Sequence, residues 1–185
     1  MSEVVHSHRV FFALWPDHEA MSHLLALAHE LTARGGGRVM RPAALHLTLA
    51  FVGSVTPARL SELGEIAAGV RAEAFDLSLD RLGFWPQRGI LWAGCRTPPA
   101  PLRRLAEVLV EDLRAAGFTI DHRSGSSLVP HITLARRARC GSLPRLETPI
   151  GWRASEFALV ETHLHPSAAS YKTLASFPLA EPEAG

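Results

Sequence analysis

The spacing of apolar and polar residues predicts three helices. In each of them apolar residues recur three or four positions apart, which gathers them on one helical face. Each pattern follows a helix-start signal, which is Trp15-Pro16-Asp17, Thr56-Pro57 or Pro98-Pro99-Ala100-Pro101. The first helix is expected to end at Gly35-Gly36-Gly37, the second near Val70 and the third at Gly117.

Shorter runs of apolar or alternating residues predict strands. Two pairs of runs separated by a turn predict hairpins, 75–82 with 89–94 and 156–163 with 171–177. Further strands are expected at 9–14, 45–52, 118–121 and around 131–134, whereas 137–155 is predicted to be a long loop. This mixture of helices and hairpins predicts an α+β fold.

One tetrapeptide occurs twice in the chain. His46-Leu47-Thr48-Leu49 returns 85 residues later as His131-Ile132-Thr133-Leu134, and the same offset relates Pro16 to Pro101, each at the start of a predicted helix. Several matches in the same order favour an internal repeat. We therefore expect residues 1–185 to form a single domain with two similar lobes, and the ends 1–7 and 180–185 to be flexible.

The repeated tetrapeptide predicts chemistry as well as structure. Side chains two positions apart in a strand share a face, so each histidine lies beside its threonine while the intervening apolar residues point into a core. Two such strands, brought together, supply an acid, a base and two hydroxyl donors, because imidazole titrates near neutral pH. This set of groups suits catalysis at a phosphate.

Composition limits the alternatives. The chain has 185 residues, of which 47% are apolar and 20% charged, with a formal net charge of +1, as in ordinary globular proteins. Cys95 and Cys140 are too few for a disulfide framework or a zinc module. Because neither a signal-peptide pattern nor a run of about 18 apolar residues is found, we expect a cytoplasmic protein without a membrane span. We also expect it to be a monomer.

The regions around both motifs resemble the 2H phosphoesterase superfamily, and within it the RNA 2′,3′-cyclic phosphodiesterases, historically called 2′-5′ RNA ligases. The resemblance is carried by residues 46–53 and 130–136, and it extends to 9–14, 79–83, 91–94 and 171–174. It implies a bilobal α+β fold. In that fold, antiparallel sheets from two pseudo-symmetric lobes line a central cleft, with one motif on each wall.

The resemblance also implies a reaction and the residues that perform it. The implied activity is hydrolysis of 2′,3′-cyclic phosphate ends of RNA, or of cyclic nucleotides, to 2′-phosphates, with no metal and no other cofactor. His46 would be the proton donor and His131 the proton acceptor, while Thr48, Thr133 and Arg136 would contact the phosphate. The positive charge near His131 agrees with this assignment, because it favours the neutral imidazole that a base requires.

Arg136 can reach the phosphate only if its strand departs from regular geometry. It lies five residues after His131, so an ideal strand places it on the opposite face unless the strand ends, twists or bulges near Leu134. Other arginines are expected to form a basic rim that attracts RNA; these are Arg34, Arg38, Arg41, Arg123, Arg137, Arg139 and Arg145. The aromatic residues that are candidates for stacking on a terminal base, or alternatively for core packing, are Phe11, Phe12, Phe84 and Trp85.

Other functions remain open at this point. The same cleft would support ATP-independent 2′-5′ RNA ligation, which is the reverse reaction, or non-catalytic binding of nucleotides or RNA ends. The pairs His6-x-His8 and His163-x-His165 have a spacing that suits a metal ion, but no carboxylate or cysteine cluster accompanies them. Turnover of a 2′,3′-cyclic substrate separates a hydrolase from a ligase and from a binding protein.

Overall fold

A computed structural model describes residues 7–120, 129–164 and 169–181 of the chain. Its helices are α1 (His18–Gly35), α2 (Pro57–Gly69) and α3 (Ala100–Ala115), with a 3-10 turn η1 at Pro42–Ala44. Its strands are β1 (His8–Leu14), β2 (Arg38–Val39), β3 (Leu47–Val55), β4 (Phe75–Leu79), β5 (Arg81–Trp85), β6 (Ile90–Gly94), β7 (His131–Arg136), β8 (Ile150–Ala154), β9 (Glu156–Leu164) and β10 (Ala169–Pro178). No described helix is long and apolar enough to cross a membrane.

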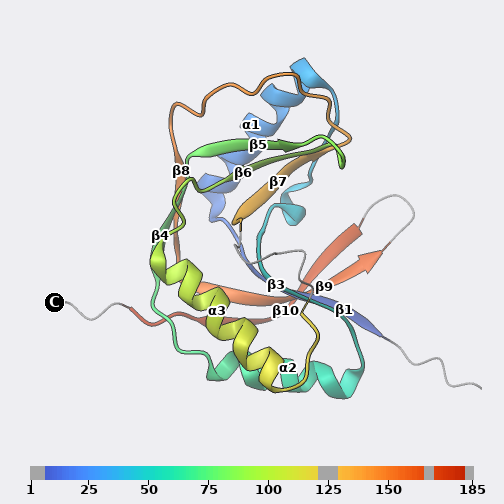
Figure 1. The fold of residues 1–185 in the computed structure, drawn as a ribbon, viewed down its shortest axis with the longest axis vertical. Coiled ribbons are helices and arrows are strands. Elements are labelled where there is room, and N and C mark those ends of the chain that lie inside the picture. The colour runs from blue at the N-terminus through green and yellow to red at the C-terminus, as the bar shows by residue number, and fades with distance from the viewer. Residues whose placement is uncertain (1–6, 121–128, 165–168, 182–185) are drawn as a thin grey trace, which may run out of the picture.

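Two lobes of antiparallel sheet meet edge to edge (Figure 1). The first lobe has the strand order β10-β9-β1-β3, and the second has β7-β6-β5 with β2 beside β7. Strands β3 and β7 join the lobes through the antiparallel pair Leu47–Ile132, so the described strands of both lobes belong to one eight-stranded sheet. The predicted α+β class with two lobes is confirmed.

The helices are exchanged between the lobes. Helix α1 follows β1 of the first lobe but packs against β2 and β7 of the second lobe and against β8. Helix α3 follows β6 of the second lobe but packs against β3 and α2 in the first. Figure 1 shows the result, with α1 beside β5 to β7 at the top and α3 beside α2 at the bottom. Each lobe is therefore built from both halves of the sequence.

Local signals explain where the helices begin and end. The Asp17 carboxylate accepts the Ala20 N–H at the start of α1, and the Thr56 hydroxyl accepts the Arg59 N–H at the start of α2. Gly36, with a φ of 65°, ends α1 and donates its N–H to the Thr32 carbonyl. All three predicted helices are confirmed.

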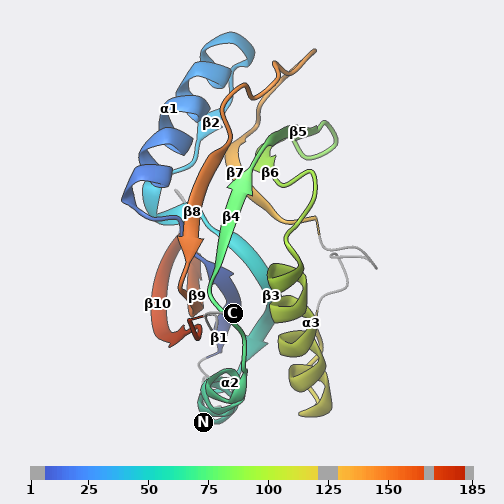
Figure 2. The same cartoon turned by 90° about the vertical axis from the view of Figure 1, so that its left-hand side faces the viewer.

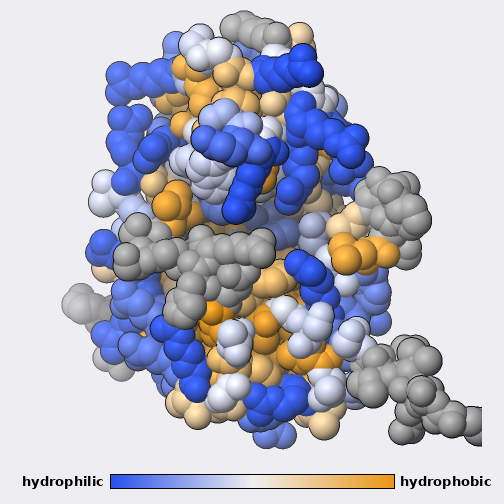
Figure 3. Space-filling model, turned by 45° about the vertical axis from the view of Figure 1, so that its right-hand side comes forward, coloured by the Kyte–Doolittle hydropathy of each residue, from blue (hydrophilic) through white to orange (hydrophobic). Residues whose placement is uncertain are grey.

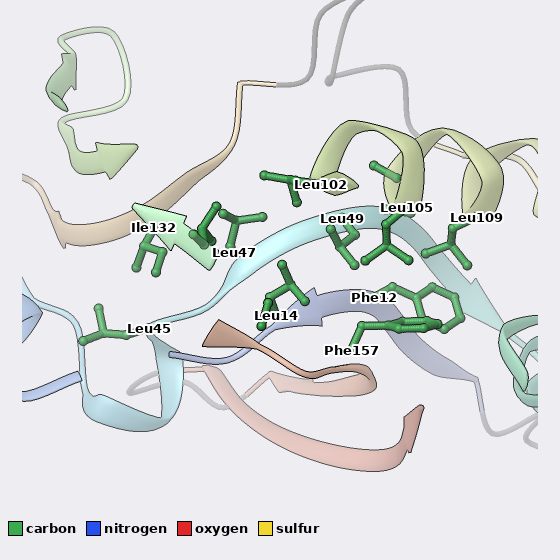
Figure 4. Close-up of a cluster of buried hydrophobic side chains, with 14 of the residues drawn as sticks. Phe12, Leu14, Leu45, Leu47, Leu49, Leu102, Leu105, Leu109, Ile132 and Phe157 are labelled. Atoms are coloured by element: carbon green, nitrogen blue, oxygen red, sulfur yellow. The ribbon is translucent and has the colours of Figure 1, made fainter. Parts of the chain in front are cut away.

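The main core lies between α3 and the first-lobe sheet and continues to the junction of the lobes (Figure 4). Phe12 and Leu14 of β1 are fully buried there, as is Leu105 of α3. At the junction, Leu47 and Ile132 are also fully buried. The apolar residues between each histidine and its threonine therefore point into the core, as the strand periodicity predicted.

The predicted strand 75–82 is wrong in its extent and its partner. It is divided at Asp80, which separates β4 from β5 and whose carboxylate accepts the Arg96 N–H at 2.7 Å. Strand β5, not β4, forms the hairpin with β6, while β4 pairs with β8 in a separate two-stranded ribbon that faces the viewer in Figure 2. The loop predicted at 137–155 therefore contains β8, whose partner lies more than 70 residues earlier.

The segment predicted as a strand at 118–121 continues the end of α3 instead. Gly117 has a φ of 77°, and Phe118 donates its N–H to the Leu113 carbonyl, which closes the helix. Residues 118–120 are not a strand, and residue 121 lies outside the described residues. Of the ends predicted to be flexible, 1–6 and 182–185 also lie outside them, whereas Ala180 is hydrogen-bonded to the backbone of Ala72 and Ala74.

Substitution of Gly83 in β5 tests how tightly the second lobe is packed. A Cβ added at this position would overlap the indole of Trp92, which lies across the glycine. We expect Gly83→Ala to lower the free energy of unfolding by about 2 kcal/mol, measured by urea denaturation, because overpacking a core displaces its neighbours. Gly64→Ala is the control: the site in α2 is open, so the variant should be slightly more stable than the wild type. A wild-type stability for Gly83→Ala would contradict this packing.

Candidate active site

The two His-x-Thr motifs lie on neighbouring strands. Leu47 pairs with Ile132 in antiparallel register, and extending this register by one residue each way sets His46 opposite Thr133 and Thr48 opposite His131. Because Leu47 and Ile132 point into the core, the histidines and threonines occupy the opposite face of the sheet. The fold thus brings the four polar motif residues to one face at the junction of the lobes.

A hollow of about 680 Å³ opens on this face. His46, Thr48 and Arg136 line it, whereas His131 and Thr133 are half-buried beside it on β7. The remaining lining residues come mainly from β1, β2, β9 and β10, and include Arg9, Phe11, Arg38, Arg41, Phe51 and Tyr171. Figure 3 shows this side of the molecule, which is recessed between the two lobes and carries hydrophilic residues along its upper part.

His46 is enclosed by aromatic rings. Its ring centroid lies 4.7 Å from that of Phe11, 5.1 Å from that of Tyr171 and 5.3 Å from that of Trp15. Burial, together with the nearby charges of His131 and Arg136, lowers the pKa of His46 to about 4. Its Nδ1 atom is buried and has no hydrogen-bond partner among the described residues. His46 is therefore neutral at pH 7 in the free protein.

His131 is held by a backbone hydrogen bond. Its Nδ1 lies 2.8 Å from the Val129 carbonyl oxygen, and the Trp85 ring packs edge-on against it at 4.7 Å. Burial lowers the pKa of His131, the Val129 carbonyl opposes this shift and Arg136 adds to it. The expected effect of positive charge on His131 agrees in direction. However, Arg136 acts on His46 in the same way, so charge alone does not distinguish the acid from the base.

Arg136 reaches the hollow through a bulge in β7. Strand β6 pairs Trp92 with Thr133 and then Leu91 with Ala135, so Leu134 is an extra residue on β7. Leu134 and Ala135 are both buried, and the alternation resumes with Arg136 on the side of the hollow. The bulge that the sequence required near Leu134 is present.

Only part of the predicted basic rim surrounds the hollow. Arg38 and Arg41 line it, and Arg41 donates to the Ala169 carbonyl at 2.9 Å. Arg145 lines a different hollow with Asp80 and Arg96, and Arg137 and Arg139 are exposed after β7. Arg123 lies outside the described residues, as does the side chain of Arg34.

Only some of the aromatic residues considered for base stacking lie at the site. Phe11 lines the hollow and Trp85 contacts His131, whereas Phe12 and Phe84 pack with the main core. The sequence did not single out Arg9, Trp15, Phe51 and Tyr171 as residues around the site. For Arg9 a signal existed, because it lies two positions before Phe11 and so shares its face of β1.

The histidine pairs considered as metal ligands are engaged otherwise where they are described. His8 Nδ1 and His163 Nε2 lie 2.6 and 3.0 Å from the two carboxylate oxygens of Glu161. Within the described residues, no group of three or more His, Cys, Asp or Glu side chains is arranged to hold a metal ion. His6 and His165 lie outside these residues.

Comparisons with known proteins agree on one family. The model of the LigT like phosphoesterase family matches residues 14–92. RNA 2′,3′-cyclic phosphodiesterase of Escherichia coli (strain K12) is 33% identical over 130 residues, which cover 70% of this chain and 72% of that protein. The enzyme of the same name from Geobacillus stearothermophilus is 33% identical over 148 residues, which cover 72% of this chain and 45% of that protein.

Among solved structures, the crystal structure of E. coli LigT complexed with 3′-AMP matches with a TM-score of 0.85 and 28% sequence identity. The match covers 95% of this chain and 100% of that chain, so it includes both lobes.

The low pKa of His46 predicts how stability depends on pH. The pKa is about 4 in the folded protein and about 6.5 when the group is exposed, so the unfolded chain takes up this proton first as the pH falls. Between pH 7 and pH 4 the wild type should lose about 3 kcal/mol more unfolding free energy than His46→Gln, measured by urea denaturation. His23→Gln, an exposed position on α1, is the control and should follow the wild type. Parallel curves for wild type and His46→Gln would show that His46 is not buried in its neutral form.

Proposed function

The chain belongs to the LigT-like phosphoesterase family, which includes the RNA 2′,3′-cyclic phosphodiesterases, and we propose that it hydrolyses 2′,3′-cyclic phosphate ends of RNA or nucleotides to 2′-phosphates. The family resemblance found in the sequence is confirmed. The observation that carries the proposal is the pairing of two His-x-Thr strands beside a hollow that Arg136 lines. E. coli LigT, whose crystal structures include complexes with 3′-AMP and with phosphate, supports a phosphate-bearing ligand.

His131 is proposed as the base. The Val129 carbonyl accepts a hydrogen bond only if Nδ1 of His131 carries the proton, which leaves the lone pair on Nε2. An imidazole held in this tautomer accepts a proton from water through Nε2. The water then attacks the cyclic phosphate.

His46 is proposed as the acid that protonates the leaving O3′. In the free protein burial and nearby positive charge hold its pKa at about 4. A bound phosphodiester brings a negative charge that offsets the charge of Arg136 and raises the pKa of His46. Substrate binding therefore favours the charged form of His46 that an acid requires. Because Nδ1 is buried, Nε2 is the ring atom proposed to donate to O3′.

Thr48, Thr133 and Arg136 are proposed to stabilise the phosphate. Negative charge grows on its non-bridging oxygens as water adds, and hydroxyl groups on both strands donate to them. The fork-shaped guanidinium of Arg136 suits two of these oxygens at once. The two histidines supply the proton transfers, so no step in this scheme requires a metal ion.

The direct experiment is turnover of 2′,3′-cyclic AMP, and of a short RNA with a cyclic end, in the presence of EDTA. We expect 2′-phosphate products, identified by chromatography, and a loss of about 10²- to 10⁴-fold in rate for His46→Ala and for His131→Ala. His23→Ala is the matched control on an exposed helix face. Full activity in either folded site variant would refute the assignment, and a 3′-phosphate product would exchange the acid and the base. Lengthened RNA would instead reveal ligation, and a bound but unchanged nucleotide would reveal a binding protein.

Arg136 predicts a shift in pH dependence as well as a loss of rate. Its charge lowers the pKa of both His46 and His131, and kcat/KM reports the groups of the free protein. Arg136→Ala should therefore move both limbs of the kcat/KM profile to higher pH while lowering its height. Arg145→Ala, an exposed arginine at a separate hollow, should leave the limbs in place. Limbs at the wild-type pH in Arg136→Ala would place its guanidinium away from the histidines.

A further inference from the structure

We propose that Arg9 and Phe51 form a subsite for a second nucleotide, the one that precedes the cyclic phosphate-bearing end. The inference rests on the proposed function and deepens it, because it makes RNA strands better substrates than cyclic mononucleotides. None of the roles assigned above involves either residue.

The subsite lies on the same sheet face as the proposed catalytic groups. Ala13 of β1 pairs with Thr48, and Arg9 lies four residues farther along β1, which is about 13 Å of strand. Between them Phe11 packs against His46, and Phe51 is the cross-strand partner of Phe11. One continuous hollow is lined by His46, Thr48 and all three of these residues. A ligand that extends beyond the reacting nucleotide along β1 therefore meets Arg9 and Phe51.

The chemistry of this pair suits a nucleotide. The Arg9 guanidinium lies 5.0 Å from the centroid of the Phe51 ring, within cation–π distance. Guanidinium planes and aromatic rings both stack on bases in single-stranded RNA, and the positive charge attracts the phosphate that links two nucleotides. Arg9 is exposed, and in the described part of the chain no carboxylate pairs with it. The Thr162 hydroxyl, on the residue paired with Arg9 in β9, adds a polar group to the same lining.

Another part of the hollow is less suited to a base. Val39, Met40 and Arg41 contribute no aromatic ring, and the Arg41 guanidinium already donates to the Ala169 carbonyl. The Arg9–Phe51 pair therefore combines aromatic and guanidinium stacking groups with a charge that no carboxylate of the described residues pairs, whereas the segment at Arg41 has no aromatic ring.

The test compares kcat/KM for 2′,3′-cyclic AMP with that for the dinucleotide ApA bearing a 2′,3′-cyclic end. The wild type should prefer the dinucleotide by about tenfold, since one stacked base is worth roughly that factor or more. Arg9→Ala and Phe51→Leu should each reduce the ratio of the two values severalfold. Leucine keeps an apolar side chain in the half-buried position, and thermal melting verifies that each variant folds. Arg9→Ala should also lower the salt dependence of dinucleotide turnover by about 0.7 in log–log slope.

Arg103→Ala is the matched control, an exposed arginine on α3 that should retain the wild-type ratio. Equal efficiency for both substrates in the wild type would overturn the subsite, as would an unchanged ratio in both Arg9→Ala and Phe51→Leu. In those cases hydrolysis of the mononucleotide persists and the proposed function stands. If the wild type opens neither substrate, the proposed function fails and the subsite falls with it.

Discussion

The pairing of β3 with β7 is the interaction on which the rest of the molecule depends. It joins two sheets that are otherwise built separately, and its register is set by Leu47 and Ile132, which are both fully buried. A slip of one residue in either strand would turn its apolar motif residues to the hollow and its histidine and threonine into the core. Burial of the apolar faces of both motif strands therefore keeps the histidines and threonines on the face of the hollow, and the pair Leu47–Ile132 determines which of them lie opposite one another.

Sequence patterns predicted most of the local structure correctly, but they did not predict the pairing of strands that are distant in sequence. Helix caps such as Asp17 and the alternation in each motif are short-range signals, so the helices and the shared face of histidine and threonine were predictable. The ribbon of β4 and β8 was not predictable, because its two strands are far apart in sequence and no short turn connects them. Arg136 lies at the hollow because β7 has a bulge at Leu134. Strand periodicity showed that such an irregularity was needed but could not show that it was present. Tyr171 and Phe51 could be placed beside the site only once the pairing order of the strands was known.

Burial among aromatic rings and the positive charge of Arg136 both lower the pKa values of the two motif histidines. Aromatic rings pack around His46 and His131 and contribute to their burial, and Arg136 repels the positive charge that either imidazole gains on protonation. An anion entering the hollow relieves that repulsion while it gains the attraction of the guanidinium. Anion binding and histidine protonation are consequently linked, and each favours the other.

The exchange of α1 and α3 between the lobes has a consequence for how the protein folds. Helix α1 packs against β7 and β8 of the later half of the chain, and α3 packs against β3 of the earlier half. Neither lobe is complete until the other half of the chain has contributed its helix, so the two lobes form together. The hollow beside the junction of the lobes therefore takes its shape only once both halves of the chain have folded.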